Sequence, residues 1–215
     1  MRTVDELAVR AQMCEMGRRL WQKGLVGASE GNLSVRLSPQ RFLVTPSGVS
    51  KGHMRPADLL VVDQRGRVVG EGQPSSELGL HMTIYGARPD CQAVIHAHPS
   101  FATAFALAGC SLPDDVMPEA MMVLGSVALA PFGLTGTPAL GESVRPFLAD
   151  HKTILLANHG AVVLGRDLTD AYNRMETLER VAEVLFRAQS LGGAQPMPRE
   201  VFEKLAPLYL HGRLT

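Results

Sequence analysis

The chain has 215 residues, and its content of 46% hydrophobic and 20% charged residues is typical of a soluble globular protein. Basic and acidic residues balance at 21 each, so the composition indicates neither a nucleic acid nor an anionic membrane as a partner. No apolar run approaches the roughly 20 residues that cross a bilayer, and the N-terminal residues do not resemble a secretory signal. The three cysteines, Cys14, Cys91 and Cys110, are scattered, which favours reduced thiols and a cytoplasmic location.

The first half of the chain predicts a helix, several short strands and a second helix. Apolar residues between Val4 and Trp21 recur near a helical period, and Lys23-Gly24 supplies a stop. Because serine favours the N-cap position, we expect the second helix to begin at Ser75 or Ser76 and to run to about Arg88. Between the helices we expect strands near 33–37 and 42–45 and a hairpin of 59–62 with 68–69.

The second half of the chain alternates strands with helices. The predicted elements are a strand at 93–96, a helix at 99–108, a strand at 127–130, a helix at 140–149, strands at 154–156 and 162–164, and helices at 168–188 and 199–208. Several strand connections are short and hairpin-like, so the sheet should be largely antiparallel and covered by helices. We therefore predict an α/β fold with one domain over residues 1–215.

Three histidines follow apolar runs that are expected to be strands. His96 and His98 end the run that begins at Ala93, and side chains two apart on a strand project from one face. His159 stands between Asn158 and Gly160, after another apolar run. Three imidazoles that converge from two strand ends are the donor set of an open, catalytic zinc site. The alternative for His96 and His98 is two buried histidines paired with backbone groups, or a chance pair on the surface.

A fourth ligand requires a carboxylate on a rigid element, and Glu77 is the candidate. The alternative is that a glutamate in the first turn of a helix only complements the helix dipole. His81 lies one turn beyond Glu77, where it can lie near the metal without touching it, or be a partly buried helix histidine. His53 and His151 lie in polar stretches and are expected to be solvated.

Three loops carry small hydrogen-bond donors. Hydroxyl groups, an amide and exposed backbone N–H groups can hold a phosphate without a lysine, although ordinary turn and capping chemistry explains each loop separately. The donors are Ser29 and Asn32 in the first loop, Ser47 and Gly48 in the second, and Ser75 and Ser76 in the third.

Taken together, these motifs resemble the class II aldolase/adducin family. The matching segments lie in order along nearly the whole chain: Ser29–Ser34, Thr45–Gly48, Pro74–Glu77, Val94–His98, Ala130–Phe132 and Asn158–Gly160. The resemblance implies a three-layer αβα fold around an antiparallel sheet. It also implies homotetramers with active sites between neighbouring subunits.

Carried over by position, the resemblance implies one Zn²⁺ per subunit held by His96, His98 and His159, with Glu77 as ligand and general base. Mn²⁺ or Co²⁺ is an alternative metal. The resemblance also joins the three serine loops into one site for the phosphate of a sugar phosphate. A related epimerase carries aspartate at the position of Glu77, so the glutamate favours carbon–carbon cleavage.

The family's aldolase has two tyrosines on the aldehyde side of its site. The stretch Met117–Met122 lacks the first, and Tyr209 is the candidate for the second, as a catalytic residue. We predict an aldolase that cleaves a ketose 1-phosphate to dihydroxyacetone phosphate and an aldehyde. The alternatives are a decarboxylase of a phosphorylated keto acid, a dehydratase or an epimerase, or a non-catalytic interaction module such as the adducin head.

Overall fold

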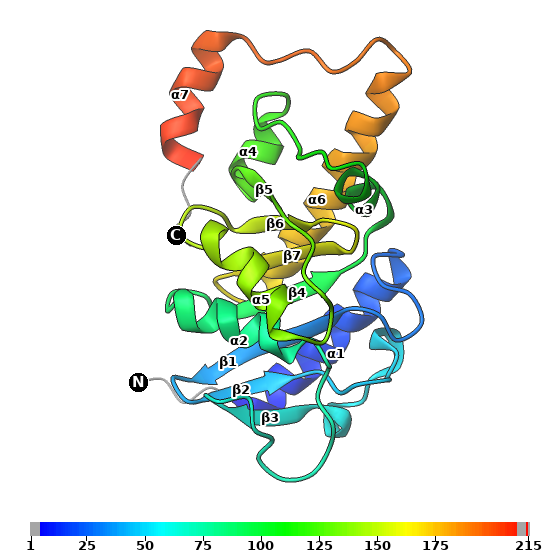
Figure 1. Cartoon of the computed structure of the whole chain (residues 1–215), viewed down its shortest axis with the longest axis vertical. Coiled ribbons are helices and arrows are strands. Elements are labelled where there is room, and N and C mark those ends of the chain that lie inside the picture. Colours follow the sequence, from blue (N-terminus) through cyan, green and yellow to red (C-terminus); the bar gives the residue numbers. More distant parts are fainter. Residues whose placement is uncertain (1–4, 210–213, 215) are drawn as a thin grey trace.

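The structure is a computed structural model that describes residues 5–209 and 214 (Figure 1). Its seven strands form one sheet in the order β3-β2-β1-β4-β7-β6-β5, and every pairing is antiparallel except that of β5 with β6. The strands are β1 (Asn32–Ser38), β2 (Arg41–Val44), β3 (Leu60–Asp63), β4 (Ala93–Ala97), β5 (Val127–Ala130), β6 (Thr153–Leu156) and β7 (Gly160–Gly165). The prediction of a largely antiparallel sheet is confirmed.

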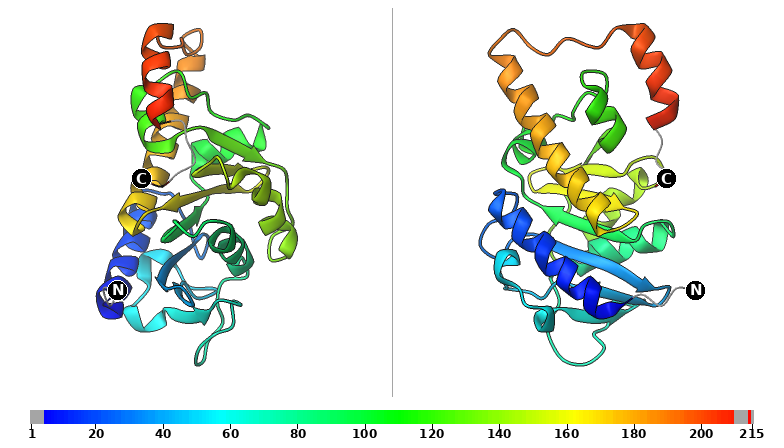
Figure 2. Two further views of the ribbon diagram at one scale, coloured as in Figure 1. Left: turned by 90° about the vertical axis from the view of Figure 1, so that its left-hand side faces the viewer. Right: turned by 180° about the vertical axis from the view of Figure 1, so that it is seen from behind.

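Helices cover both faces of this sheet, which gives three layers (Figure 2). One face packs against α1 (Glu6–Gln22), α3 (Ser100–Leu107), α4 (Pro118–Leu124) and α6 (Leu168–Gln189). The other face packs against α2 (Leu78–Ala87) and α5 (Pro138–Val144). Along β4, Ile95 faces the first layer and Val94 the second, as strand alternation requires. The predicted αβα fold is therefore confirmed.

Three sequence predictions are wrong in detail. The helix expected over 140–149 is split into α5 and a 3-10 turn at Arg145–Phe147, because Pro146 cannot donate a helical hydrogen bond. The hairpin arm expected at 68–69 is only an isolated bridge between Val68 and Val62. The second helix begins at Leu78, later than Ser75 or Ser76, because Leu78 N–H closes a turn onto the Ser75 carbonyl at 3.1 Å.

The first and last helices lie close to their predicted positions, and one short helix was not predicted. Asp5 caps α1, whose predicted first residue Val4 lies outside the described residues. The C-terminal helix α7 (Arg199–Tyr209) stands beside α4 at one end of the molecule (Figure 1). A further short helix, α4, was not expected from the sequence, and Pro118 occupies its first turn.

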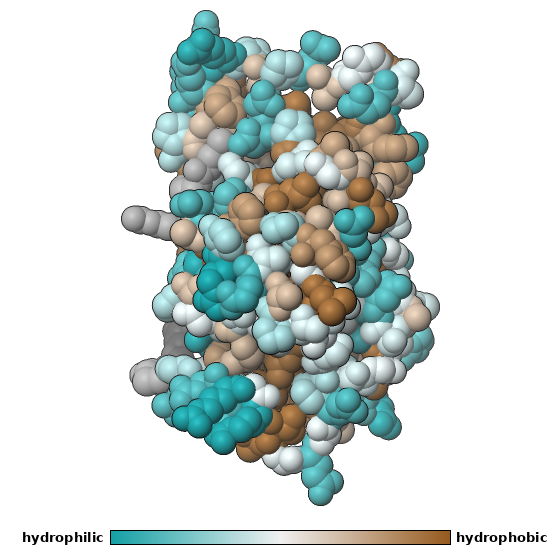
Figure 3. All heavy atoms as spheres, viewed as in Figure 1, coloured by the Kyte–Doolittle hydropathy of each residue, from teal (hydrophilic) through white to brown (hydrophobic). Residues whose placement is uncertain are grey.

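On the face seen in Figure 3, hydrophilic residues are interspersed with hydrophobic ones. In the loop after β5, Phe132 and Leu134 are each 58% exposed. Within the described part of the chain, no helix combines the length and the hydropathy required to cross a bilayer.

Candidate active site

Three imidazoles meet at one end of the sheet, although one of them lies more than sixty residues along the chain from the other two. His96 lies at the end of β4, His98 just beyond it, and His159 in the turn before β7, the neighbour of β4. One ring nitrogen of each lies within 4.8 Å of those of the other two. His96 is fully buried, whereas the His159 and His98 side chains are 10% and 25% exposed. The predicted convergence is therefore present.

The spacing of these donors fits a tetrahedral ion. Two nitrogens bound at 2.0–2.1 Å to one tetrahedral ion lie about 3.4 Å apart, and the Nε2 atoms of His96 and His98 are 3.0 Å apart. His96 Nδ1 donates to the Ala161 carbonyl at 2.9 Å, which leaves Nε2 directed at the shared centre. Burial beside the other two imidazoles lowers the pKa of His98 to about 4, so this ring is a neutral donor near pH 7. The residues present therefore fit a divalent cation.

The segment Asn158–Gly160 has the shape that the site requires. Asn158 has φ 58°, a left-handed conformation that asparagine tolerates, and His159 N–H closes the turn onto the Leu156 carbonyl at 3.0 Å. A Cβ on Gly160 would lie 2.5 Å from His98 Cδ2 and 2.6 Å from the Ala97 carbonyl oxygen. Only glycine therefore lets the His98 ring pack against the start of β7.

The Glu77 carboxylate faces two of the three imidazoles. Its oxygens lie 3.2 Å from His96 Nε2 and 3.2 Å from His159 Nε2. Burial alone raises the pKa of this carboxyl, but the hydrogen bonds with His159 and His96 outweigh burial and hold the pKa well below its usual range. Glu77 occupies the N-cap position of α2, but its side chain accepts no capping hydrogen bond from the helix. The carboxylate can therefore contact the histidines instead. Its role as a metal ligand stays a prediction.

The three serine loops lie side by side. Ser47 N–H donates to the Gln73 carbonyl at 2.9 Å, and Ser75 N–H donates to the Thr45 carbonyl at 3.2 Å. The buried Lys51 ammonium joins the first two loops, because it donates to the Ser29 carbonyl at 3.0 Å and to the Val49 carbonyl. Gly48 has φ 71°. Ser29, Ser47 and Ser76 are exposed and Ser75 is half-buried. Ser76 directly precedes Glu77, so the third loop lies beside the histidine cluster, and the phosphate-binding role of these serines stays a prediction.

Asn32, the remaining predicted phosphate donor, has a different environment. Its side chain is 3% exposed, and its Nδ2 donates to Glu77 at 2.8 Å. Its Oδ1 lies 2.5 Å from His81 Nε2. Both ends of the amide are therefore engaged inside the protein, and the role of Asn32 in holding a phosphate stays a prediction.

Tyr209 is not brought to the histidines of its own chain. Its carbonyl lies 3.5 Å from the position a Cβ would take on Gly125, just before β5. The parallel strands β5 and β6 place this end opposite the end where Leu156 leads into His159. The catalytic role of Tyr209 stays a prediction that requires a second copy of the chain. The stretch Met117–Met122 lies at the start of α4.

Two acidic residues near the cluster escaped the sequence analysis. Glu30 Oε2 lies 3.4 Å from His98 Nδ1. Glu179 of α6 accepts hydrogen bonds from Phe101 N–H at 3.0 Å and Ala102 N–H at 2.9 Å, so it caps α3 directly after His98 and Pro99. No sequence pattern indicates either contact. Glu179 is distant from α3 along the chain, and nothing in the sequence distinguishes Glu30 from the other acidic residues in loops.

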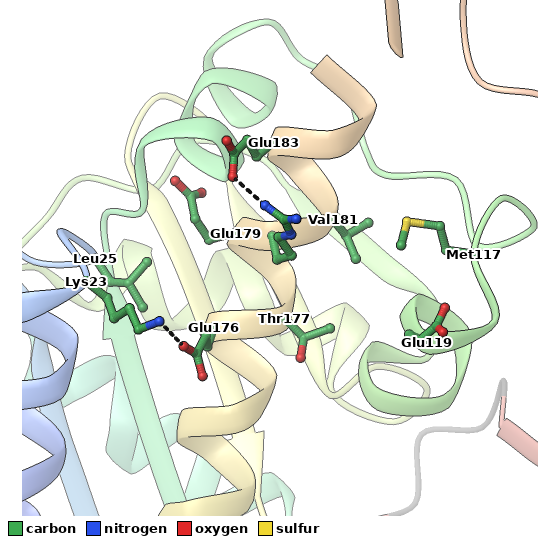
Figure 4. Close-up of a pocket in the computed structure, with 10 residues that line it drawn as sticks. Lys23, Leu25, Met117, Glu119, Glu176, Thr177, Glu179, Val181 and Glu183 are labelled. Atoms are coloured by element: carbon green, nitrogen blue, oxygen red, sulfur yellow. Dashed lines mark hydrogen bonds and ion pairs between the residues drawn. The ribbon is translucent and has the colours of Figure 1, made fainter. Parts of the chain in front are cut away.

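A hollow of about 530 Å³ lies elsewhere, against α6 (Figure 4). Four of the charged side chains that line it form ion pairs: Lys23 with Glu176 at 3.0 Å, and Arg180 with Glu183 at 3.3 Å. None of the three clustered histidines lines it. The histidine cluster has the convergent chemistry, and we take it as the candidate active site.

The fold and this cluster define an α/β protein with three histidines, arranged as in metal-binding sites, at one end of its sheet. The family model "Class II Aldolase and Adducin N-terminal domain" matches residues 11–186, and the chain belongs to this family. The resemblance noted from the sequence motifs is thereby confirmed.

Individual relatives carry different enzyme names. The chain is 35% identical over 190 residues to 3-oxo-tetronate 4-phosphate decarboxylase of Haemophilus influenzae, covering 86% of this chain and 90% of the relative. It is 36% identical over 174 residues to L-fuculose phosphate aldolase of Methanococcus maripaludis, covering 81% and 94%. Among solved structures, YgbL of Escherichia coli has a TM-score of 0.87 at 31% identity, covering 94% of this chain and 99% of that one. Its description leaves aldolase, epimerase and decarboxylase open.

Proposed function

We propose that this protein is a zinc-dependent lyase that breaks a carbon–carbon bond beside the carbonyl of a phosphorylated sugar derivative. The observation that carries the proposal is the convergence of His96, His98 and His159, with the Glu77 carboxylate against two of them. An all-imidazole donor set with a carboxylate suits Zn²⁺, and Mn²⁺ or Co²⁺ are the alternatives. When bound, the ion supplies a Lewis acid that stabilises the negative charge of an enediolate.

The chain's own residues have distinct parts in this proposal. The serine loops bind the phosphate, and so fix the carbonyl of the substrate near the three imidazoles. The Glu77 carboxylate moves a proton to and from the carbon beside that carbonyl. Its low pKa, caused by His159 and His96, makes it a weak base until one of its contacts is exchanged for substrate or metal.

Within this class we favour decarboxylation of a 3-oxo four-carbon sugar acid 4-phosphate. The bond between C1 and C2 breaks, carbon dioxide leaves, and the enediolate takes a proton at C2 to give dihydroxyacetone phosphate. This step requires no removal of a hydroxyl proton. It therefore suits a chain whose stretch Met117–Met122 lacks the expected tyrosine. The decarboxylase names of relatives at 33–35% identity support it.

The second candidate is aldol cleavage of a ketose 1-phosphate, which the similarity to L-fuculose phosphate aldolases supports. Here the C4 hydroxyl loses its proton, the bond between C3 and C4 breaks, an aldehyde leaves, and the same enediolate takes a proton at C3. Both reactions thus share one half, the protonation of the dihydroxyacetone phosphate enediolate.

The shared half-reaction gives the test. Zinc-loaded protein incubated with dihydroxyacetone phosphate in D₂O should exchange one C–H hydrogen for deuterium, as measured by NMR. Glu77→Gln should bind the metal but lose most of the exchange, because an amide cannot carry the proton. Absence of exchange in the zinc-loaded wild-type protein would reject the proposal. Release of carbon dioxide from the keto acid, or of an aldehyde from a ketose 1-phosphate, then separates the two candidates.

We also propose a cytoplasmic homotetramer with active sites between subunits. Leu107, Phe186 and Leu208 are large apolar side chains, each more than half exposed, that a neighbouring subunit would cover. Tyr209 would then be supplied to the histidines of a neighbouring copy. Analytical ultracentrifugation tests the assembly, and a monomer at micromolar concentration would contradict it.

A further inference from the structure

A single chain of hydrogen bonds runs from the Glu77 carboxylate into the core. Asn32 Nδ2 donates to Glu77 at 2.8 Å, and Asn32 Oδ1 lies 2.5 Å from His81 Nε2. Ser34 Oγ lies 2.6 Å from His81 Nδ1 and 2.8 Å from the Tyr85 hydroxyl. Apart from Glu77, every member is at most 4% exposed, so solvent does not compete for these contacts.

The hydrogen-bonded side chains come alternately from two elements, β1 and α2 with its N-cap. Glu77, His81 and Tyr85 are spaced four apart, so they lie on one face of α2 and its N-cap. Asn32 and Ser34 alternate on β1 and face α2, because the residue between them, Leu33, packs in the opposite layer. Each side chain from one element therefore contacts the next side chain of the other.

The charge on Glu77 fixes the direction of every bond in this chain. An ionised carboxylate only accepts hydrogen bonds, so Asn32 must present its NH₂ group to Glu77. Its carbonyl oxygen then faces His81, which must donate from Nε2. His81 Nδ1 consequently accepts from the Ser34 hydroxyl, and Ser34 accepts from Tyr85. Burial lowers the pKa of His81 to about 3, which agrees with a neutral ring.

We propose that His81, as the Nε2–H tautomer, is a positioning residue that locks the Asn32 amide and thereby holds the Glu77 carboxylate toward the metal cluster. The inference rests on the proposed function, which gives Glu77 its part as ligand and base. His81 has no hydrogen bond to the three clustered histidines or to the serines of the three loops, so it acts on Glu77 through Asn32.

A proton wire is the competing role for such a chain, and its chemistry argues against it. A proton passing from His81 to Glu77 would have to cross Asn32, and an amide carries no proton that it readily gives up and regains. Asn32 therefore transmits orientation but not a proton. The proton that Glu77 handles must be exchanged with the substrate or with solvent.

The test compares three variants without substrate. His81→Leu removes the donor, and His81→Gln keeps an N–H near the position of Nε2. Ile84→Ala, on the same helix and outside the chain of bonds, controls for lost packing. Co²⁺ affinity and the Co²⁺ absorption spectrum are the readouts. We expect at least about a 10-fold loss of affinity in His81→Leu, as for other residues that orient metal ligands, near-normal affinity in His81→Gln, and none lost in Ile84→Ala.

NMR of the ¹⁵N-labelled wild-type protein gives an independent readout, because it reports directly which ring nitrogen of His81 carries the proton. The Nε2–H tautomer is expected from pH 6 to pH 8. The Nδ1–H tautomer, or normal Co²⁺ affinity in a folded His81→Leu protein, would overturn the inference. If His81→Leu does not fold, the tautomer alone decides. Failure of deuterium exchange with these readouts intact would count against the proposed function and leave the positioning role standing.

Discussion

Substitution of Gly160 by alanine should damage the metal site although glycine carries no ligand. The new Cβ would lie 2.5 Å from His98 Cδ2 and 2.6 Å from the Ala97 carbonyl oxygen. Carbon atoms in ordinary contact lie about 3.5–4.0 Å apart, so the His98 ring would have to move by about 1 Å. The Ala97 carbonyl cannot yield easily, because Ala97 pairs with Ala161 in the sheet.

A displacement of this size exceeds what a metal site tolerates, since ligand distances must hold to about 0.2 Å. We expect Gly160→Ala to lose at least about 10-fold in Zn²⁺ affinity. Overpacking should also lower the free energy of unfolding by about 1–3 kcal/mol. Competition with a chromophoric chelator measures the affinity, and urea denaturation of the metal-free protein measures the stability.

Gly86→Ala is the matched control. Gly86 lies in α2, where a Cβ meets no other atom within 4 Å. Alanine in a helix should raise the free energy of unfolding by up to about 1 kcal/mol and leave Zn²⁺ affinity unchanged. If Gly160→Ala bound Zn²⁺ as tightly as the wild-type protein and unfolded at the same urea concentration, the account of the Asn158–Gly160 turn would be refuted.

Three further predictions concern residues around the site. Burial lowers the pKa of Lys51 from 10.5 to about 8. Between these pH values the unfolded chain holds more protons than the folded one, so the free energy of unfolding should rise with pH. Urea titrations should show a shallower rise with pH in Lys51→Met, and an unchanged rise would contradict this. Glu179→Gln should lose about 0.5–2 kcal/mol of stability with the α3 cap. Glu183→Gln on the same helix, which removes only the surface ion pairs with Arg180 and Arg187, should lose less, and equal effects would argue against capping. Glu30→Gln should weaken Zn²⁺ binding up to about 10-fold by freeing His98, and calorimetry showing unchanged affinity would rule this out.

The local patterns of the sequence predicted most elements and the three histidines that cluster in the structure. The two-residue spacing of His96 and His98 after an apolar run placed them on one strand end, and Asn158–Gly160 marked a turn. The helical period predicted α1 and α6 to within a few residues. Proline was the main source of error in the helices, since Pro146 ends α5 early and Pro118 begins the unexpected α4.

Long-range contacts lay outside the reach of these patterns. His81 could be placed near Glu77 by its spacing on the helix, but its partner Asn32 lies 49 residues away and on another element. Lys51 was not singled out, although it is 2% exposed and joins two loops. The contacts of the Asn32 side chain with Glu77 and His81 join elements that are distant along the chain, so no local pattern indicated them.

The sequence by itself determined which chemical groups are available and which of them share a strand face or a helix face, because these properties depend on neighbours within a few residues. Only the tertiary structure decided that β4 and β7 are adjacent, that Glu77 faces their histidines, and that β1 and α2 interleave. Such pairings depend on the packing of the whole sheet against its helices, and no local spacing along the chain encodes them.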